Sequence, residues 1–453
     1  MGGLDGTKVM PKRKLGLVMC VALVVGNMIG SGIFLLPANL APYGLNAIWG
    51  WVITIGGAMC LATVFAGLAK AMPDAGGPYD YVARSMGAPP AFLVMWSYWI
   101  STWVTNAAIS IAAVSYLSTL SPGFFAVPGV APLVAIAFVA LFTAIACTGA
   151  HVSGGVQIFT SVLKVMPLVA AMVIALIVLG NGDQQAQFAP TPVTPNGIAG
   201  AAALTLWAML GFECAAIPAE RVKDPARTIS RATLIGTLAV GLIYLAASSA
   251  VFILLPADIA AKSAAPFADL VGSFWGPTAS LLVVFFAAIS CLGALNGWVL
   301  LQGEVPLTLA RRGVFPQWFG KVNSRGMPVR AQVLSSTLAM LLVAANYTKG
   351  LTELFAFMAL LATVATLVLY LFATIAALRL MVRGQLSRGL LFVTLVGAVY
   401  SIWTFYGAGK EATLWGLLLL MTAIPVWFGM RLSSLWSSPA PAAAPAGPPE
   451  SLS

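Results

Sequence analysis

The feature that most limits how this chain can fold is a series of long, continuous apolar runs. The runs are about 20 residues or longer, the length at which an apolar helix crosses roughly 30 Å of bilayer hydrocarbon. They do not alternate with period two, which argues against the strands of a membrane barrel. Only 8% of the residues are charged, against about 25% in a soluble protein, so the chain cannot cover itself with a surface suited to water. The sequence predicts an all-α membrane protein.

Twelve transmembrane helices are predicted from these runs. Residues 1–14 are basic and precede no signal-peptide cleavage site, so the first span is expected to be retained, after a cytoplasmic N-terminal segment. Residues 437–453 are rich in Pro and Ala and are expected to be disordered. The expected spans are 15–40, 46–70, 90–118, 127–148, 155–180, 198–219, 231–255, 278–310, 329–347, 353–379, 389–407 and 412–431.

The basic residues favour the same topology. Of the 23 Lys and Arg residues, 19 fall on the side of the N-terminus, three (Lys262, Lys349 and Lys410) fall on the other side, and Lys164 lies within a span. Because basic loops stay in the cytoplasm, this bias predicts an even number of spans with both termini cytoplasmic. It also accounts for the net charge of +10 without a nucleic-acid partner. The partner expected from composition is the lipid bilayer.

Several classes of function find no support in the sequence. The five Cys residues lie in apolar segments without paired spacing, and the single His151 cannot form a multi-histidine centre, so neither a metal nor another cofactor is expected. No paired carboxylates, nucleophile elbow or phosphate-binding loop is present. The protein is therefore not expected to be an enzyme.

Two of the apolar runs contain residues that interrupt a helix. GNMIGSGIFLLP in the first span combines three glycines with an Asn, a Ser and a Pro, and TLWAMLGFECAAIPAE in the sixth contains Gly211, Glu213 and Pro218. Close helix packing alone would explain small residues in one span. Two interruptions five spans apart instead indicate two inverted repeats of five helices, with substrate bound where broken helices 1 and 6 meet, and they disfavour a receptor or channel. The expected repeats are 15–180 and 198–379, followed by the last two spans at 389–431.

The motifs along the spans identify a family. GNMIGSGIFLLPANLA, GGPYDYVARSMG, YWISTWVTNAA, LWAMLGFECAA, PAERVKDPARTISRA and CLGALNGWVLL together resemble the amino acid–polyamine–organocation (APC) superfamily of transporters. The likeness is strongest to its basic amino acid/polyamine antiporter branch, in particular the bacterial arginine–agmatine antiporter. It implies the leucine-transporter-type (LeuT) fold and alternating access. The implied function is secondary active exchange of an arginine-like cationic amino acid for its decarboxylated amine, agmatine or similar, or for another amino acid.

The interruptions and the resemblance together suggest a substrate site. Backbone N–H groups around Ser31 and Gly32 would bind a carboxylate at the positive end of a half-helix, and carbonyls near Trp207 and Leu210 would bind an α-ammonium. The resemblance implies that Trp207 and Trp298 stack on a cationic substrate. The expected substrate-binding residues are Asn27, Ile29, Gly30, Ser31, Gly32, Ser101, Thr102, Asn106, Ile109, Trp207, Ala208, Leu210, Trp298 and Ala362.

The resemblance also implies gates and a proton-coupling residue. Tyr98, Trp207, Glu213 and Tyr370 match gating positions. Glu213 is an acid within a span, which indicates a functional role, and it matches the acid proposed as the antiporter's proton sensor. Lys164 is the second candidate for proton coupling, because other superfamily members place a fifth-span lysine near the first-span interruption.

The sequence leaves the substrate open. Ser101, Thr102, Ile109 and Ala362 depart from the residues expected at the side-chain end of an arginine antiporter's pocket. The alternative function is a proton-coupled symporter of neutral or broad-range amino acids that uses Lys164. A homodimer through the late apolar spans, and location in a bacterial inner membrane, are implied by the resemblance alone.

Overall fold

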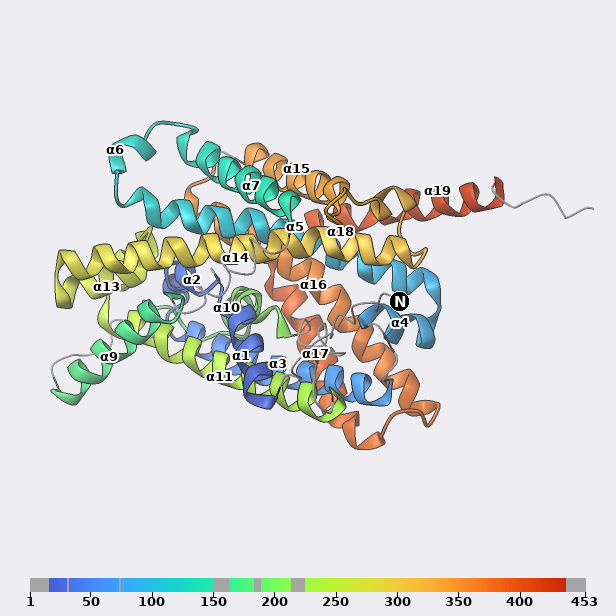
Figure 1. The fold of residues 1–453 in the computed structure, drawn as a ribbon. Helices are drawn as coiled ribbons and strands as arrows, with labels where there is room; N and C mark the ends of the chain where they lie inside the picture. Colours follow the sequence, from blue (N-terminus) through green and yellow to red (C-terminus); the bar gives the residue numbers. More distant parts are fainter. Residues whose placement is uncertain are drawn as a thin grey trace, which may run out of the picture.

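The computed structural model describes residues 16–30, 32–72, 75, 77–149, 163–182, 189–212, 225–346 and 348–436, and these ranges contain helices and no strand (Figure 1). The main helices are α1 (Leu17–Met28), α2 (Gly32–Leu40), α3 (Leu45–Ala71), α5 (Ala88–Ser118), α7 (Val130–Thr148), α9 (Met166–Gly180), α10 (Pro195–Met209), α11 (Pro225–Leu254), α14 (Pro277–Arg311), α15 (Val329–Ala345), α16 (Leu351–Val382), α17 (Leu391–Gly407), α18 (Gly409–Met421) and α19 (Ala423–Trp436). Shorter helices are η1 (Ala41–Tyr43), α4 (Pro78–Met86), α6 (Pro122–Phe125), α12 (Ala257–Lys262), α13 (Pro266–Trp275), η4 (Gln317–Gly320) and η5 (Arg388–Leu390).

Eight helical segments of the described chain are long and apolar enough to cross a membrane. They lie in α3, α5, α7, α11, α14, α16, α17 and the α18–α19 pair, whereas α1, α9 and α15 are apolar but shorter. Helices at the expected spans 46–70, 90–118, 278–310 and 353–379 begin and end within three residues of the predicted bounds. The structure is thus that of an all-helical membrane protein, and the count of twelve spans stays a prediction.

The structure adds helices where only connections between spans were expected. Pro78 opens α4 and Gly87 follows its end, and Pro266 and Gly276 frame α13 in the same way. Proline in the first turn and glycine after the last are normal helix boundaries, so residues that resemble loop signals mark short helices here. The last expected span, 412–431, is divided between α18 and α19.

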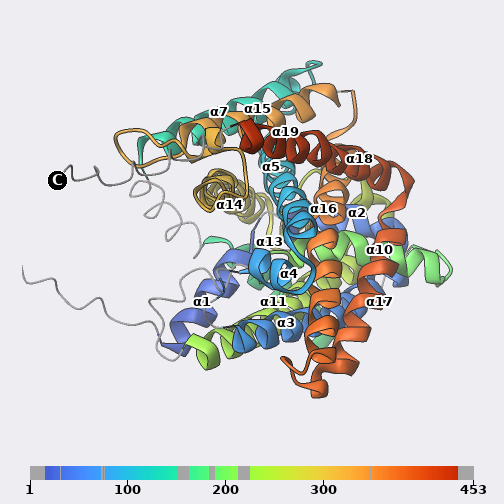
Figure 2. The ribbon, with the colours of Figure 1, turned by 90° about the vertical axis from the view of Figure 1, so that its right-hand side faces the viewer.

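The helices form two packed groups joined by α2 and α16. α5, α7, α14 and α15 contact one another, and α1, α3, α10 and α11 form the second group. Figures 1 and 2 show the first group above and the second below in both views, with α10 nearest the middle. α2 contacts α10 and α11 on one side and α5 on the other, and α16 contacts α5, α3 and α10. The short helix α2 therefore lies between the two groups.

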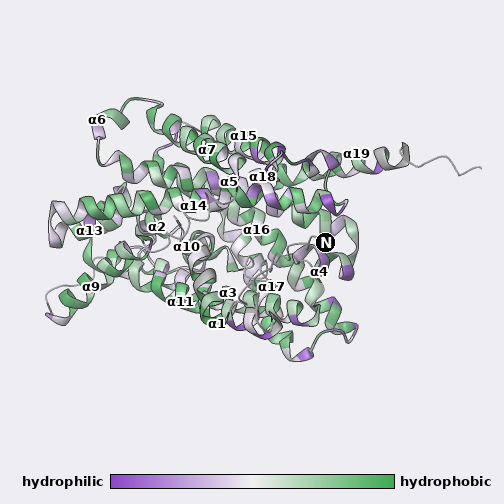
Figure 3. Ribbon diagram, viewed as in Figure 1, coloured by the Kyte–Doolittle hydropathy of each residue, from purple (hydrophilic) through white to green (hydrophobic). Residues whose placement is uncertain are grey.

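Charged residues gather at the ends of the bundle. At one end, here called the basic end, Arg312 pairs with Asp80 of α4 at 2.8 Å, and Arg383 donates hydrogen bonds to the carbonyls of Arg84 and Ser85. Figure 3 shows hydrophilic residues around α4 and apolar residues along the helices. An exposed ion pair contributes only about 0–1 kcal/mol, so these contacts locate α4 against α14 and α16 more than they stabilise the fold.

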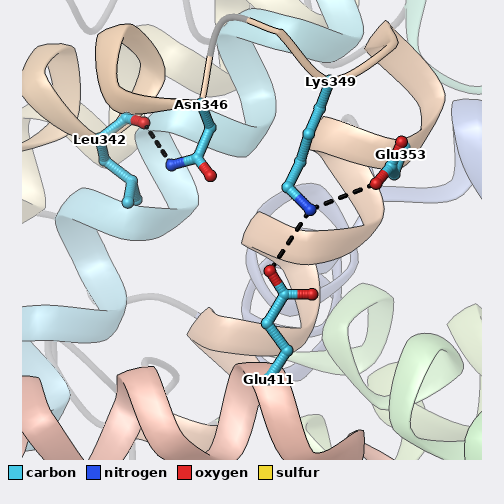
Figure 4. Close-up of polar contacts among 5 residues, drawn as sticks. All are labelled: Leu342, Asn346, Lys349, Glu353 and Glu411. Atoms are coloured by element: carbon cyan, nitrogen blue, oxygen red, sulfur yellow. Dashed lines mark hydrogen bonds and ion pairs between the residues drawn. The ribbon is translucent and has the colours of Figure 1, made fainter.

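At the opposite end, a lysine links three segments. The Nζ atom of Lys349, in the loop before α16, lies 3.2 Å from Glu353 of α16 and 3.3 Å from Glu411 of α18 (Figure 4). These hydrogen bonds, first to Glu353 and then to Glu411, raise the pKa of Lys349 and keep it charged. The Nδ2 atom of Asn346 donates to the carbonyl of Leu342 and so closes the end of α15. The two ion pairs of Lys349 thereby connect the start of α16 to α18.

α3, α10 and α17 approach closely at a hydroxyl junction. The Oγ1 atom of Thr54 on α3 lies 2.8 Å from that of Thr205 on α10, and the hydroxyl of Tyr400 on α17 donates to Thr54 at 3.2 Å. Near this junction, a Cβ atom added to Gly57 would lie 2.4 Å from the Tyr400 ring, whereas one added to Gly56 would meet nothing within 4 Å. The absence of a side chain at Gly57 is what admits the Tyr400 ring.

Gly57→Ala should destabilise the protein by about 1–3 kcal/mol, because the added methyl group overpacks against a ring held by its own hydroxyl. Gly56→Ala is the matched control: it makes the same change in helix propensity on the same helix without the clash. Thermal denaturation of the two variants in detergent measures the difference. Equal midpoints would contradict tight packing at Gly57.

Candidate functional site

The first apolar run is interrupted in the middle, as its glycines predict. α1 ends at Met28, Ile29 has an extended conformation with ψ 95°, and α2 begins at Gly32. Ser31 and the side chain of Asn27 lie outside the described residues. The interruption leaves the last carbonyls of α1 and the first amides of α2 without partners inside their own helices.

Two carbonyls at the end of α1 accept hydrogen bonds from side chains that are far away in the sequence. The amide of Ile29 donates to the carbonyl of Val25 at 2.8 Å. The Nζ atom of Lys164, whose residue is only 1% exposed, donates to the carbonyl of Gly26 at 3.1 Å. The hydroxyl of Tyr244 on α11 donates to the carbonyl of Met28 at 2.9 Å. Hydrogen-bond donors thus replace the next helical turn.

A second interruption follows α10. This helix ends at Met209, Leu210 is extended with ψ 148°, and Gly211 has a φ of 110°. Only glycine adopts that φ without strain, so Gly211 turns the chain away from the helix axis. Residues 213–224 lie outside the described residues, and Glu213 is among them.

The two interruptions meet around a cavity. The cavity contains about 310 Å³ of space free of protein atoms, its opening included. The approach is close, since a Cβ atom added to Gly32 would lie 2.9 Å from the Trp207 ring and 3.1 Å from the Cα atom of Ala208. The lining residues are Met28, Gly30, Gly32, Thr105, Ile109, Trp207, Ala208, Leu210 and Trp298.

Aromatic rings border the cavity along α10 and α16. The Trp207 ring packs edge-to-face against Phe355 with centroids 5.0 Å apart. Beyond Leu210, Phe212 stacks on Tyr370 at 5.1 Å, and Phe65 packs edge-on against both rings. Phe355 lies near the start of α16 and Tyr370 lies in its second half. Of the rings in these contacts, only that of Trp207 belongs to the described cavity wall; Phe355 packs against it, and the other three lie around the second interruption.

The described polar atoms of the cavity wall carry no charge. Among the lining residues that the structure describes, none is Asp, Glu, Lys or Arg. The Oγ1 atom of Thr105 and the Nε1 atom of Trp207 are buried and have no hydrogen-bond partner. A buried polar atom without a partner costs free energy unless a ligand or water satisfies it. The wall thus offers unsatisfied neutral groups beside an aromatic surface. Within the described part of the chain, no group of His, Cys, Asp and Glu side chains could hold a metal ion.

The structure brings about half of the expected binding residues to this wall. Gly30, Gly32, Ile109, Trp207, Ala208, Leu210 and Trp298 line the cavity, and Ile29 is buried at the interruption. Ser101, Thr102, Asn106 and Ala362 are buried but lie outside the lining. Two of these are already satisfied, because the hydroxyls of Ser101 and Thr102 donate to the carbonyls of Tyr98 and Trp99 in their own helix.

Two lining residues, Met28 and Thr105, were not predicted from the sequence. Thr105 lies four residues before Ile109 on α5, so helical spacing alone puts it on the same face. That signal was available but weak, because Thr is common in buried helices. Met28 sits between residues of the first-span motif and lines the cavity because α1 ends there.

A helical membrane protein with a cavity between two chain interruptions belongs to the class of transporters. Residues 15–428 match the amino acid permease family. The chain is similar to the cadaverine/lysine antiporter of Escherichia coli K12, with 34% identity over 409 residues, 88% of this chain and 90% of that protein. It is 30% identical to the putrescine transporter PotE of Haemophilus influenzae over 413 residues, 90% of this chain and 94% of that one. It is also 30% identical to a putative arginine/ornithine antiporter of Bacillus subtilis over 405 residues, 82% and 86% of the two chains.

The chain therefore belongs to the amino acid permease family of the APC transporters, as the motifs indicated. The similar proteins are transporters and not enzymes, in agreement with the expectation from the sequence.

Tyr244→Phe tests the support of the first interruption. Without the Tyr244 hydroxyl, the carbonyl of Met28 loses its hydrogen-bond partner. We therefore expect the free energy of unfolding to fall by about 1–3 kcal/mol, which a lower thermal midpoint in detergent would show. Tyr116→Phe is the matched control. It removes a hydrogen bond of the same 2.9 Å length to the carbonyl of Phe34, which lies inside α2 and is available to the helix's own amide. An equal loss of stability in Tyr116→Phe and Tyr244→Phe would contradict this expectation, because the Met28 carbonyl would then depend on its tyrosine no more than the Phe34 carbonyl does.

Proposed function

We propose that the protein exchanges a cationic amino acid for an amine or another amino acid by alternating access. The observation that carries this is the cavity between two chain interruptions, whose described lining is uncharged and includes two indoles, in a chain about one-third identical to a cadaverine/lysine antiporter. An arginine-like amino acid and an agmatine-like amine are the narrower form of the proposal. Relatives whose names include lysine, cadaverine, putrescine and ornithine favour the broader class of basic amino acids and polyamines.

The substrate's carboxylate would bind at the start of α2. The first amides of a helix have no partners within it, and the helix dipole adds positive potential there. Gly30 and Gly32 line the cavity at this point, so the backbone is open to a ligand. The α-ammonium would go to carbonyls near Trp207 and Leu210, where α10 ends.

The cationic end of the substrate would lie against the indoles. Trp207 and Trp298 both line the cavity and come from different helices, α10 and α14. A cation over a desolvated indole gains about 2 kcal/mol. No carboxylate belongs to the described lining, so selectivity for a cation would rest on these rings and on neutral hydrogen-bond acceptors.

The membrane arrangement belongs to the same proposal. Twelve spans would form a LeuT fold, with inverted repeats at 15–180 and 198–379 and two further spans at 389–431. The basic end of the bundle would face the cytoplasm of a bacterial cell, across its inner membrane, because Arg312 and Arg383 gather there. The exposed apolar faces of α17 and α18 suit lipid or a second copy of the chain in a homodimer.

Tyr98, Trp207, Glu213 and Tyr370 are proposed as gating residues. The stack of Phe212 on Tyr370 supports this, because it holds the residue before Glu213 against α16 directly after the second interruption. Glu213 would follow this stack and couple its protonation to gate movement.

Radiolabelled arginine uptake into proteoliposomes tests the exchange. We expect uptake only when the vesicles are preloaded with arginine, lysine, agmatine or cadaverine, and none with buffer or alanine inside. Trp298→Ala should raise the KM for arginine about tenfold or more through the lost cation–π contact. Trp415→Ala, at a position 51% exposed on α18, is the control and should leave KM unchanged. Arginine and lysine uptake that fails under every loading condition would overturn the cationic proposal.

The second candidate function is proton-coupled symport of neutral or broad-range amino acids. The hydrogen bond from Lys164 to the carbonyl of Gly26 favours it, because a titratable group then touches the interrupted helix directly. Loss of the proton would remove the positive charge of Lys164, although its neutral amine could still donate a hydrogen bond to the carbonyl of Gly26.

Lys164→Arg separates this candidate from exchange. Arginine keeps the donor for the carbonyl of Gly26 but does not release its proton. For a symporter, accumulation of labelled alanine driven by an imposed proton gradient should be present in the wild-type protein and absent in the variant, whereas an exchanger should retain exchange in both. Lys262→Arg, on α12 near the opposite end, is the matched control and should change neither activity. Proton-driven accumulation that survives in Lys164→Arg would exclude Lys164 as the coupling residue.

A further inference from the structure

The loop between α14 and α15, at the basic end of the bundle, concentrates positive charge. Residues 305–345 contain no Asp or Glu, and their five basic residues are Arg311, Arg312, Lys321, Arg325 and Arg330. Arg312 pairs with Asp80 of α4. No carboxylate of the described chain forms an ion pair with Lys321, Arg325 or Arg330. The loop therefore presents positive charge that the protein itself does not neutralise.

Arg330, the second residue of α15, lies against an indole. Its guanidinium carbon is 5.6 Å from the centroid of the Trp318 ring, and Trp318 is 47% exposed. Trp318 belongs to η4, where the next residue, Phe319, is buried and packs on Phe315 and Trp99. Phe319 thus anchors η4 in the bundle and leaves the indole of Trp318 at the surface. The indole covers one face of the guanidinium, and the N–H groups at its edge donate to no atom of the described chain.

The face of α15 that begins at Arg330 continues as a stripe of mostly apolar residues. Val333, Thr337 and Leu341, here called the α15 stripe, follow Arg330 at intervals of three or four residues and so share its face of the helix. Val333 and Leu341 are about half exposed. α15 packs against α7 at the outer edge of the bundle (Figures 1 and 2). A membrane protein presents such an edge to lipid, so the stripe suits acyl chains and the Trp318–Arg330 pair suits the headgroup level.

We propose that Arg330 and Trp318 form a binding site for the phosphate of an anionic phospholipid, one of whose acyl chains lies along the α15 stripe. A guanidinium binds phosphate oxygens through paired N–H donors, and stacking on an indole leaves those donors free. The remaining cations of the loop favour a lipid with a net negative charge. A zwitterionic lipid fits less well, because its own cationic group would lie in the same positive potential. The site is separate from the cavity and does not depend on the transported substrate.

Binding of radiolabelled phosphatidylglycerol to the lipid-depleted protein in detergent tests this site. A scintillation-proximity assay gives the Kd, and unlabelled phosphatidylglycerol, phosphatidylcholine and inorganic phosphate are compared as competitors. We expect phosphatidylglycerol to compete about tenfold better than phosphatidylcholine. Inorganic phosphate should displace no more label than chloride at equal ionic strength, because it lacks the acyl chains that contact the α15 stripe.

Two variants test the two side chains of the site. Arg330→Gln should raise the Kd for phosphatidylglycerol about tenfold, because it removes charge-assisted hydrogen bonds to the phosphate. Trp318→Leu keeps every charge and should raise the Kd about threefold, because the guanidinium loses the ring that holds it. Both changes lie at the surface, so each variant should keep the wild-type thermal midpoint in detergent without lipid.

Arg388→Gln is the matched control. It removes another exposed arginine near the basic end, in η5, and this arginine stacks on no ring of the described chain. Its Kd for phosphatidylglycerol should stay within about twofold of the wild-type value. A loss as large as that in Arg330→Gln would assign binding to the overall charge of this end and overturn the site.

The other outcomes are equally decisive. Phosphatidylcholine that competes as well as phosphatidylglycerol would overturn the preference for an anionic lipid, and displacement by inorganic phosphate would overturn a lipid as the ligand. A wild-type Kd in Arg330→Gln or in Trp318→Leu would overturn the assignment to this pair. Because the assay measures lipid binding without transport, each of these results leaves the proposed exchange untouched.

Discussion

Backbone carbonyls and amides that lack partners inside a bilayer cost several kcal/mol each, and the structure around the first interruption meets this constraint. α1 stops in the middle of an apolar run, and its last carbonyls are satisfied by Lys164 and by the hydroxyl of Tyr244 on α11. The donors come from elements far apart in the sequence, so the interruption is stable only in the assembled bundle. In the proposed function, the amides at the start of α2 donate to the substrate. The cavity lies where the chain is interrupted, with Met28, Gly30 and Gly32 in its wall.

Small residues bring the two interruptions together. Gly32 faces the Trp207 ring at a separation that leaves no room for a methyl group. Behind this contact, α10 is held to α3 by the Thr54–Thr205 hydroxyl pair and by the approach of Gly50 to Ala201, where an added Cβ atom would lie 2.6 Å from that of Ala201. Close packing by glycine and alanine replaces the hydrophobic effect, which gives no drive for association between helices already in lipid.

The described cavity wall carries no charged side chain, although the proposed substrate is a cation. A buried carboxylate would hold a cation tightly, yet it would be costly when the site is empty, since a lone ion in an apolar interior is strongly disfavoured. Indole faces and neutral oxygens also attract a cation, and burying them in the empty site costs less free energy than burying a carboxylate. This arrangement suits a carrier that must release its substrate on the far side of the membrane. Relatives named for lysine, cadaverine and putrescine share a family with this chain, and all three compounds carry a primary ammonium at a chain end.

The sequence by itself determined the class of protein, the main helices and both interruptions. Runs of apolar residues need no tertiary partner to predict a membrane helix, and the glycines at 30, 32 and 211 weaken a helix wherever it packs. The sequence also pointed to Trp207 and Trp298, which the tertiary structure brings to one wall. The sequence could not show that the hydroxyls of Ser101 and Thr102 donate to carbonyls of their own helix. Nor could it show that the hydroxyl of Thr105 has no hydrogen-bond partner. Those facts, and the hydrogen bond that the amide of Asn106 donates to Gln302 on α14, were decided by tertiary structure, because hydrogen-bond partners in a dry interior depend on which helices lie side by side.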